Sequence, residues 1–366
     1  MSNFLLVLNN LNQGGVQLEA LAIAKTLSKK YEVKIFAGSD GNISDMFKKS
    51  KLELKIFKGE SSKINILEIL KFKQYLKLLT NKNTTIISFS VKHTLLLAII
   101  NALSFKKHKI IYRHSGMLIT KDQGFLIRVR NYLIDLINIY STHRTICVAQ
   151  SNSIQLQKLY KCRQKINFCP TFYDTRKFRG RDKSIDKLKL SKILNVEKES
   201  FIILCPLSFV KNKNQHEILR IAEKINEDII WCFCGNGNLL NEFEQLVKKS
   251  PKQRQIHIQG GVDNIEVYIS GSDLIVSAST YMEGLPQIYS QANFCNTPTI
   301  AFDWAGAKDE IKDGKNGYLI EHKNFNQFQK RIMDVYNKET SFIKDFDIFN
   351  YDHDENSLLS FINLIS

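Results

Sequence analysis

Short apolar runs alternate with amphipathic stretches along most of this chain. The runs are rich in Ile, Leu, Val and Phe and end at polar or glycine-bearing turns, which is typical of buried strands. We predict strands at Phe4–Leu8, Glu32–Phe36, Glu53–Phe57, Thr85–Phe89, Ile110–Arg113, Thr145–Val148, Phe201–Cys205, Ile229–Cys234, Ile256–Gln259, Asp273–Val276 and Thr299–Phe302. We predict helices at Val16–Leu27, Ile64–Leu79, Thr94–Leu103, Phe125–Ile139, Gln215–Ile225, Asn238–Lys249, Pro286–Cys295 and Asn350–Ile365. This alternation predicts parallel sheets with helices on both faces.

The alternation is interrupted at 171–190 by a stretch of turn-forming and polar residues. We interpret it as a linker, because domain boundaries fall in segments of this composition. A chain of 366 residues also exceeds the usual size of a single core. The sequence thus predicts the α/β class, with two Rossmann-like, doubly wound parallel-sheet domains, 1–170 and 191–345, that face a central cleft. Residues 346–366 are expected to form a C-terminal helix that can cross back to the N-terminal domain.

The seven cysteines are scattered, and no Cys-x-x-Cys pair or Cys/His cluster with metal-ligand spacing occurs in the sequence. We therefore expect reduced thiols and no metal site. The first ten residues lack the basic start of a signal peptide. The longest apolar stretch, Thr94–Phe105, is too short to cross a bilayer. These features predict a cytoplasmic protein.

Positive charge is concentrated in the first half of the chain. Residues 1–180 contain 30 Lys and Arg against 10 Asp and Glu, a net charge of +20, and the remainder carries −4, which gives the total of +16. Such an excess attracts a polyanionic surface, either phospholipid or nucleic acid, unless it only reflects a lysine-rich source. No helix-turn-helix, zinc-finger or RNP-like pattern supports nucleic acid, so we expect an anionic membrane surface.

The predicted helix Ile64–Leu79 is one candidate for this contact. It interleaves Lys71, Lys73 and Lys77 with apolar residues, as helices at a membrane interface do. A helix packed on the core, with lysines that extend their amino groups to solvent, is the alternative.

Glycine-bearing turns follow predicted strands in both halves. Gly14-Gly15 follows Phe4–Leu8, and Gly235-Asn236-Gly237 follows Ile229–Cys234. A helix start offers free backbone N–H groups and the positive end of its dipole, and glycine lets a ligand approach the backbone closely. Such turns suit a phosphate group, although a glycine after a strand is also an ordinary turn.

The segment Ser277–Thr299 is more specific. It places Glu283 on a loop directly before Gly284-Leu285-Pro286, and proline is favoured at the first position of a helix. Gln291, eight residues after Glu283, lies about 12 Å further along the helix axis. This span suits a sugar at one end, a diphosphate at the helix start and a ribose beyond it. The alternative is an ordinary carboxylate before a helix.

Several short motifs occur in a defined order along nearly the whole chain. They are Gly14-Gly15, Val148–Ser151, Pro170–Asp174 with Phe178, Lys213-Asn214, Gly235-Asn236-Gly237, Ser279–Pro286, Asp303–Ile311 and Asp313–Tyr318. In this set the chain resembles the retaining glycosyltransferases of family 4, also called glycosyl transferases group 1. That family has the GT-B fold of two facing Rossmann-like domains.

The resemblance implies an enzyme of polysaccharide biosynthesis, such as that of lipopolysaccharide or capsule. It would transfer a hexose or an N-acetylhexosamine from a nucleotide sugar, a UDP-sugar rather than a GDP-sugar. The acceptor would be lipid-linked or a cell-surface polysaccharide, and the anomeric configuration would be retained. The resemblance also implies that neither a protein nucleophile nor a metal or other cofactor is required. The basic N-terminal domain would face the acceptor and hold the enzyme on the inner face of the cytoplasmic membrane.

The resemblance also implies roles for individual residues. Glu283 would contact hydroxyls of the donor sugar, and Lys213 would neutralise the diphosphate as its bond to the anomeric carbon breaks. His114 would be a sugar-side histidine, with a structural or exposed role as the alternative, and His93 is a second candidate near the acceptor. The donor-binding candidates are Gly14, Gly15, Ser208, Lys211, Gly235, Gly237, Gly284, Leu285, Pro286 and Gln291.

Two positions depart from the family pattern. Ser208 stands where the family usually has an arginine, and Gln291 where it usually has a second glutamate. A neutral amide lacks charge-assisted hydrogen bonds, and loss of the arginine removes a bidentate phosphate contact that Lys211 would have to replace. The departures leave open a non-catalytic role, in which the chain stabilises or guides another glycosyltransferase.

Overall fold

Strand β1 (Asn3–Leu8) shows why the first half of the chain needs helices on both faces of its sheet. Its side chains alternate between two cores. Phe4, Leu6 and Leu8 belong to the core that includes α1 (Gly15–Leu27) and α14 (Glu355–Ile365). Leu5 and Val7 belong to the core that includes α3 (Ile66–Leu79) and α4 (Val91–Ala102). A strand buried on both faces is apolar at every position, which explains the unbroken run FLLVL.

The computed structural model describes residues 3–12, 14–57, 64–81, 83–104, 107–119, 123–280, 284–349, 351 and 353–365. The chain divides into two compact units. The first unit combines Met1–Tyr173 with Asp352–Ser366, and the second is Asp174–Tyr351.

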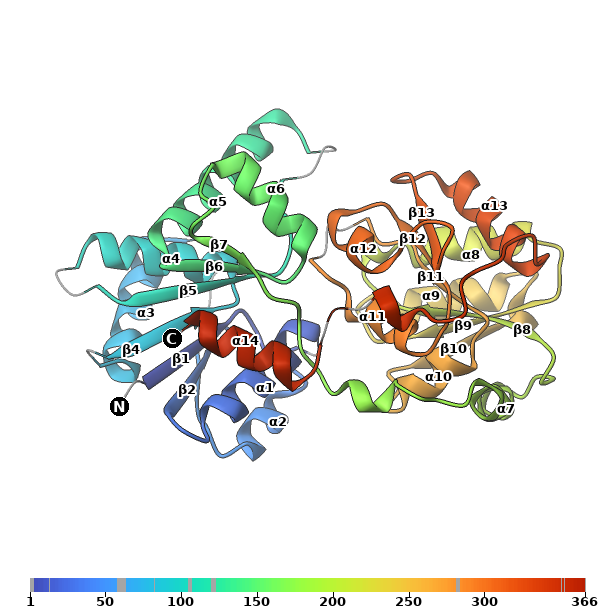
Figure 1. Ribbon diagram of the computed structural model, residues 1–366, viewed down its shortest axis with the longest axis horizontal. Coiled ribbons are helices and arrows are strands. Elements are labelled where there is room, and N and C mark those ends of the chain that lie inside the picture. Colours follow the sequence, from blue (N-terminus) through green and yellow to red (C-terminus); the bar gives the residue numbers. More distant parts are fainter. Residues whose placement is uncertain are drawn as a thin grey trace. The chain divides into compact units, whose positions relative to one another are not determined.

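Within the described residues, the first unit has a seven-stranded parallel sheet in the order β3-β2-β1-β4-β5-β6-β7 (Figure 1). Its further elements are β2 (Glu32–Ala37), α2 (Ser44–Lys49), β3 (Glu53–Ile56), β4 (Thr84–Ser88), β5 (Lys109–His114), α5 (Phe125–Ser141), β6 (Arg144–Cys147), α6 (Gln150–Tyr160) and β7 (Ile166–Phe168). In Figure 1, α14 lies beside α1, so the end of the chain completes the first unit.

The second unit has a six-stranded parallel sheet in its described part, in the order β10-β9-β8-β11-β12-β13. It begins with η1 (Thr175–Lys177), α7 (Lys183–Leu194), β8 (Phe201–Pro206), η2 (Lys211–Lys213), α8 (Gln215–Lys224), β9 (Ile229–Cys234), α9 (Leu240–Lys249) and η3 (Gln253–Gln255). It continues with β10 (Ile256–Gly260), α10 (Ile265–Gly271), β11 (Leu274–Ser277), α11 (Gln287–Phe294), β12 (Thr299–Phe302), α12 (Ala305–Glu310), β13 (Gly317–Ile320), α13 (Phe325–Tyr336) and η4 (Asp347–Phe349).

Both sheets reverse their strand order beside their first strand. In the first sheet β1 pairs with β2 on one side and β4 on the other. In the second sheet β8 pairs with β9 and with β11. At such a switch point the two following loops leave toward opposite faces, and a crevice forms at the carboxyl ends of the strands. These two edges are therefore where a ligand site is expected.

The predicted α/β class with two Rossmann-like parallel-sheet units is confirmed, and each predicted strand is present within one residue of its expected bounds. Sequence periodicity missed two edge strands and six helices: β7, β13, α2, α6, α7, α10, α12 and α13. These strands are only three and four residues long, and three of the helices have six or seven residues, too short for a periodic signal.

The stretch 171–190, expected to be a linker, is partly folded onto the second unit. It contains η1 and the start of α7, whose cap Asp182 accepts hydrogen bonds from the backbone N–H groups of Ser184 and Ile185. The units divide between Tyr173 and Asp174. In the part of the chain that is described, no helix combines the length and the hydropathy that a membrane crossing needs.

Candidate functional site

The loops that follow β8 and β11 are joined at the switch point of the second sheet. The Asn214 side-chain amide donates hydrogen bonds to Ala278 O at 2.7 Å and to Thr280 Oγ1 at 3.1 Å. In the other direction, the Thr280 backbone N–H donates to Asn212 O at 2.8 Å. Because β8 and β11 are parallel neighbours, these bonds place the two loops side by side at the carboxyl edge of the sheet.

Asn214 occupies the left-handed region, with φ +54°, at the junction of η2 and α8. Asparagine adopts this conformation more readily than most residues. The turn brings Lys213 beside the segment that leads to Glu283. Lys213 is half-buried, and Lys211 and Ser208 are exposed on the same loop. Glu283 itself lies outside the described residues, so its predicted sugar contact stays a prediction.

The segment after β11 reaches α11 through Gly284, Leu285 and Pro286. Leu285 is buried, and Pro286 caps the helix rather than opening it, since α11 begins at Gln287. The expectation of proline at the first helical position is therefore off by one residue. Gln291 is half-buried on the second turn of α11. The structure thus brings Lys213 and Gly284–Pro286 to one edge of one sheet.

A buried polar network fixes α11 from its far end. The Asn293 amide donates to Glu310 O at 3.0 Å and to Glu310 Oε2 at 3.1 Å. Asn316 donates to Asn293 Oδ1 at 2.8 Å and to Glu310 O at 2.8 Å. These side chains are almost wholly buried, so a change in one removes hydrogen bonds that water cannot replace. No motif in the sequence indicated Asn293, which lies two residues after Gln291 and therefore on a different face of α11.

The glycines after β9 have a structural reason within the chain itself. A Cβ on Gly235 would lie 1.8 Å from Leu207 O, and one on Gly237 would lie 2.3 Å from Phe209 O. Gly235 also has φ +146°. The loops after β8 and β9 therefore pack against each other so closely that only glycine fits. Gly235 and Gly237 therefore have a packing role, and their role in donor binding stays a prediction.

Gly14 and Gly15 lie at the switch point of the first sheet, where α1 begins. Gly14 has extended backbone with φ −173°, and a Cβ there would meet only the end of the flexible Gln17 side chain, at 2.8 Å to Oε1. Gly15 is exposed. Packing within the described residues therefore does not require glycine at position 14, in contrast to Gly235. The Gln17 amide donates to Asn10 Oδ1 at 3.0 Å, so a side chain at position 14 would have to move this contact, and the role of Gly14 in donor binding stays a prediction.

His114 ends β5 and is fully buried. Its Nε2 lies 3.9 Å from Asp135 Oδ1, too far for a hydrogen bond, and its ring packs edge-on against Tyr112. Burial lowers the pKa of His114 to about 4, so the imidazole is neutral at pH 7. Burial raises the pKa of Asp135 to about 7, and the nearby Tyr160 hydroxyl only partly offsets this. The structural alternative fits this burial, and contact of His114 with a sugar stays a prediction.

His93 lies in an aromatic core. Its ring packs edge-on against Phe36 and Phe72, and its Nδ1 lies 2.9 Å from Ser90 Oγ. Burial, and then the neighbouring Lys92 charge, lower the pKa of His93 to about 3. These contacts give His93 a packing role at the start of α4.

The sequence analysis missed a buried ion pair that fixes the first unit. The Arg113 guanidinium lies 2.5 Å from Glu19 Oε1, and both side chains are almost wholly buried. Arg113 also donates to the carbonyl oxygens of Cys169 and Pro170, at 2.7 and 2.9 Å. It thereby connects α1, β5 and the end of the first unit. Only an arginine inside a strand-like run could have indicated it from sequence.

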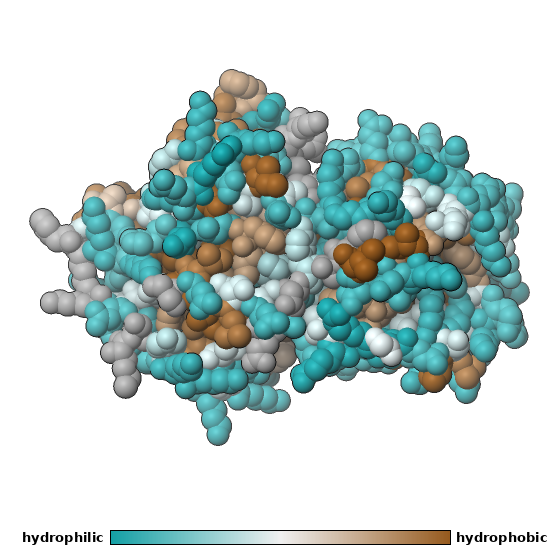
Figure 2. Space-filling view, in the orientation of Figure 1, coloured by the Kyte–Doolittle hydropathy of each residue, from teal (hydrophilic) through white to brown (hydrophobic). Residues whose placement is uncertain are grey.

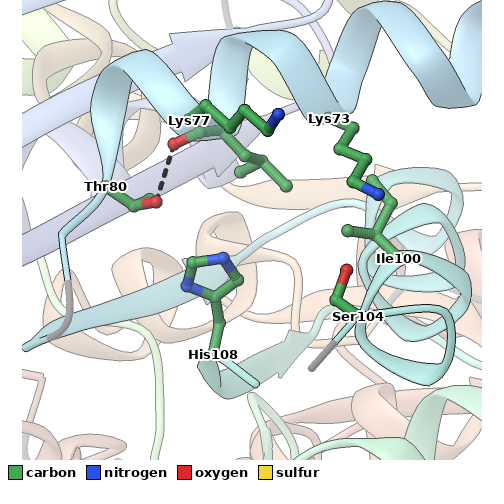
Figure 3. Close-up of a pocket in the computed structure, with 7 residues that line it drawn as sticks. Lys73, Lys77, Thr80, Ile100, Ser104 and His108 are labelled. Atoms are coloured by element: carbon green, nitrogen blue, oxygen red, sulfur yellow. Dashed lines mark hydrogen bonds between the residues drawn. The ribbon is translucent and has the colours of Figure 1, made fainter. Parts of the chain in front are cut away.

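A cavity of about 200 Å³ lies at the opposite edge of the first sheet, where β5 begins (Figure 3). Lys73 and Lys77 of α3 extend over it, with His108 and Ser104 below, and the Thr80 hydroxyl donates to Leu76 O at 2.6 Å. Because ligand sites of such sheets lie at the carboxyl ends of the strands, this cavity is separate from the candidate site. Among the described residues, no three His, Cys, Asp or Glu side chains are grouped to hold a metal ion.

With this geometry in place, the chain can be compared with known proteins. Residues 186–347 match the family model of glycosyl transferases group 1. This match covers the second unit, with the Asn214-bridged loops, Lys213 and the whole Ser277–Thr299 segment inside it. The similarity to glycosyl transferases group 1 that the motifs indicated is therefore found in the half of the chain that contains the candidate site.

Two sequence relatives carry glycosyltransferase names. EpsD of Bacillus subtilis (strain 168), named as a glycosyltransferase, is 28% identical over 157 residues, 42% of this chain and 41% of that protein. The UDP-Gal:alpha-D-GlcNAc-diphosphoundecaprenol alpha-1,3-galactosyltransferase of Escherichia coli is 25% identical over 202 residues, 53% of this chain and 51% of that protein. The chain spans about half or less of the length of these relatives.

Solved structures match over the whole chain. HepE of Anabaena in complex with UDP superposes with a TM-score of 0.77 at 16% identity and covers 100% of this chain and 99% of its own. A glycosyltransferase from Rickettsia africae superposes with a TM-score of 0.76 at 16% identity, covering 100% and 98%. Together with the two Rossmann-like units, these likenesses confirm the GT-B fold.

Proposed function

We propose that this protein is a glycosyltransferase that uses a nucleotide-sugar donor. The observation that carries the proposal is the Asn214-bridged pair of loops at the switch point of the second sheet. These loops hold Lys213 and the segment around Glu283, and they lie inside the region that matches glycosyl transferases group 1. The switch point of a parallel sheet is where a nucleotide binds in folds of this kind.

The proposed chemistry depends on positioning and on charge. The bond between the anomeric carbon and the donor phosphate breaks, and the acceptor oxygen bonds to that carbon on the same face, so configuration is retained. The leaving phosphate takes the acceptor proton. Lys213 and the backbone N–H groups of Gly284 and Leu285 stabilise the negative charge that develops on the diphosphate, a large term in catalysis. Glu283 orients the sugar hydroxyls, and no metal ion is needed.

We propose a UDP-sugar as the donor, with a hexose or an N-acetylhexosamine as the sugar. HepE was solved with UDP and with UDP-glucose, and the name of the Escherichia coli relative specifies UDP-Gal. In this scheme the half-buried Gln291 accepts or donates one hydrogen bond at the ribose.

We further propose a lipid-linked or cell-surface polysaccharide acceptor, reached at the cytoplasmic face of an anionic membrane. The support is the net charge of +20 on residues 1–180 against −4 on the rest. Basic residues near an anionic leaflet each contribute about 1 kcal/mol of attraction, so a fraction of this excess is enough.

The test is a thermal-shift series with UDP, UDP-glucose, UDP-galactose, UDP-N-acetylglucosamine and GDP-mannose. Binding to the native state raises the melting temperature, and we expect the UDP compounds to do so. Lys213→Ala should weaken UDP binding by about 10- to 100-fold, since it removes a charge-assisted contact worth roughly 1.5–3 kcal/mol. Lys248→Ala, on the exposed end of α9, is the matched control and should leave binding unchanged. If no nucleotide sugar binds or is turned over, the proposal fails.

A non-catalytic partner subunit is the second candidate, and Ser208 and Gln291 favour it. Such a subunit would neither bind nor hydrolyse a nucleotide sugar and would co-purify with an active glycosyltransferase. Restoring the usual residues with the double substitution Ser208→Arg and Gln291→Glu separates the two. If both positions only tune an active site, the wild type already binds UDP and the double variant should bind it more tightly, whereas a partner subunit shows no UDP binding in the wild type.

A further inference from the structure

A groove with a volume of about 480 Å³ lies on the first unit between α5, α6 and the loop that follows β5. This volume is within the range of pockets that hold small ligands. Six of its eight lining residues are apolar or aromatic, and the other two are Gln155 and Arg128. The apolar and aromatic lining residues are Met117, Ile119, Phe125, Val129, Tyr132 and Leu159.

The groove is formed before any ligand binds, because each wall is fixed by contacts of its own. Asn131 of α5 donates a hydrogen bond to Leu118 O at 2.8 Å, which holds the loop after β5 against the helix. Tyr132 stacks on Tyr160 with ring centroids 5.1 Å apart, which joins α5 to α6 below the groove. A ligand therefore does not have to order these walls, which favours binding.

The first half of α5 extends beyond the core of its unit. All residues from Gly124 to Arg130 are exposed, and Phe125 and Leu126 expose 77% and 80% of their surface. Figure 2 shows hydrophobic side chains, in brown, gathered at the end of the unit where α5 and α6 lie (top of the view). Apolar residues gathered in this way mark an interaction site with an apolar partner.

The charges around the groove determine which apolar partner fits. Arg128 and Arg130 of α5 and Lys158 of α6 are exposed, and the only carboxylate on these two helices, Asp135, is fully buried. In a wider stretch, residues 69–173 contain 17 Lys and Arg against two Asp. The partner should therefore be apolar along its length and carry negative charge at one end.

Two lining residues place part of the groove near the carboxyl edge of the first sheet, where the acceptor is expected. Met117 and Ile119 follow directly after β5, which ends at the carboxyl edge with His114. That edge also carries Gly14 and Gly15 at its switch point. A ligand in this groove would extend along the outside of the first unit with one end near this edge.

We propose that the groove binds the hydrocarbon chain of a phosphate-linked lipid, with Arg128 facing the phosphate, and that this lipid is the acceptor. The role of this lipid as the acceptor rests on the proposed glycosyl transfer. A groove lined by six apolar or aromatic residues offers only Gln155 and Arg128 as polar side-chain partners to a polyol or a sugar polymer, so most of the ligand's hydroxyl groups would lose their hydrogen bonds to water without replacement. A chain lipid loses none, and its phosphate gains a charge-assisted contact.

The test is isothermal titration of the full chain with farnesyl phosphate in solution, below the concentration at which it forms micelles. We expect saturable binding that neither inorganic phosphate nor farnesol reproduces at the same concentration. Val129→Asp should weaken binding at least tenfold, because it places a carboxylate in the groove next to the chain. Leu126→Asp makes the same change three residues away at a side chain that does not line the groove, and it should change binding less than twofold.

A second matched pair tests the phosphate contact. Arg128→Gln should weaken farnesyl phosphate binding about five- to tenfold and leave farnesol unaffected. Arg130→Gln should have little effect, because Arg130 does not line the groove and its guanidinium bonds to Asn131. All four substituted residues are exposed, so unchanged circular dichroism and melting temperature verify that the variants fold.

Three outcomes would overturn the proposal. If the protein bound only anionic vesicles, and Val129→Asp and Leu126→Asp weakened that binding equally, the surface would be a general membrane contact. Equal binding of inorganic phosphate would make it an anion site, and no binding of farnesyl phosphate would leave no lipid site. A thermal shift with UDP on the same sample distinguishes this failure from that of the proposed transferase. If farnesyl phosphate binds and UDP does not, the result supports the lipid site and contradicts its role as the acceptor site.

Discussion

Single ionisable side chains inside the first unit set its response to pH. His114 and Asp135 are both buried, with Nε2 and Oδ1 3.9 Å apart, and burial shifts each toward its neutral form. Burial also raises the pKa of Glu19, and the Arg113 guanidinium, 2.5 Å from Glu19 Oε1, opposes this shift. Burial therefore opposes charge at all three groups, and at Glu19 a paired cation works against that effect.

Asp135→Asn tests the burial of this carboxyl. A group with a pKa raised to about 7 binds its proton more tightly in the folded state, so it lowers stability as pH rises from about 4 to about 7. Burial of His114 raises stability as pH rises from about 4 to the ordinary pKa of histidine, the opposite of the Asp135 effect. The stability of the variant is therefore compared with that of the wild type at each pH. We expect the variant to gain stability over the wild type between about pH 4 and pH 7, reaching roughly 4 kcal/mol by pH 8, since one pKa unit corresponds to about 1.4 kcal/mol. Urea denaturation at each pH measures this, and a difference independent of pH would contradict it.

At the scale of elements, the turns between strands and helices fall into two classes. The turn after β9 needs glycine for packing, since Gly235 faces Leu207 O. The turn after β1 does not, since Gly14 has extended backbone and open space apart from the end of Gln17. The glycine after β9 is required by packing in the second unit, whereas a ligand role for Gly14 stays a prediction.

Gly14→Ala and Gly235→Ala should therefore differ in their effects on stability and on UDP binding. Gly235→Ala should lower the melting temperature strongly or prevent soluble expression, because a Cβ would lie 1.8 Å from a carbonyl oxygen. Gly14→Ala should leave the melting temperature unchanged and weaken UDP binding several-fold, if a phosphate approaches this backbone. Thermal melts with and without UDP measure both. Equal destabilisation by the two changes would show that Gly14 also has a packing role.

Helix α14 joins the last residues of the chain to the first unit. Phe361 is fully buried, with the Arg113 guanidinium 5.3 Å above its ring, and Lys109 Nζ donates to Ile365 O at 3.0 Å. The Cys169 thiol contacts Ser357 O at 3.4 Å. The helix is therefore a structural part of this unit.

Phe361→Ala should destabilise the first unit by about 3–5 kcal/mol, the usual loss for truncating a buried phenylalanine. Both tryptophans, Trp231 and Trp304, lie in the second unit, so their fluorescence follows that unit alone, whereas far-UV circular dichroism follows both. We expect the dichroism transition to shift and the fluorescence transition to stay. Leu359→Ala, half-exposed on the same helix, is the control. A shift in the fluorescence transition of equal size would mean that the two units unfold together.

At the scale of the whole molecule, charge distinguishes the halves of the chain. The excess of +20 in residues 1–180 contrasts with −4 in the remainder, and the second unit contains the region that matches glycosyl transferases group 1. This division of charge assigns membrane attraction to the first unit and donor binding to the second in the proposed function.

Binding to vesicles tests this assignment. We expect co-sedimentation with phosphatidylglycerol-containing vesicles, none with pure phosphatidylcholine, and a loss of at least tenfold in the bound fraction between 50 and about 500 mM salt, because salt screens surface charge. Replacing Lys71, Lys73 and Lys77 by Gln tests whether α3 contributes. Binding that is insensitive to salt and to these changes would remove the electrostatic membrane contact.

The amino-acid sequence determined the identity and order of the elements. Unbroken apolar runs such as FLLVL require burial on both faces, so the two parallel sheets follow from local pattern alone. Lys213 and Gly284–Pro286 could be placed at one strand edge for the same reason, as each follows a predicted strand of the same half.

Only the tertiary structure decided which partners those faces and loops meet. Periodicity indicates that a side chain is buried but does not identify the residue that it packs against. It therefore could not predict the strand order, the Asn214 bridge to Ala278 or the packing of Phe361 against Arg113. The burial of His114 and the groove beside α5 arise in the same way, from segments that are distant in sequence and adjacent in the fold. Non-local packing, which no local pattern records, placed these residues.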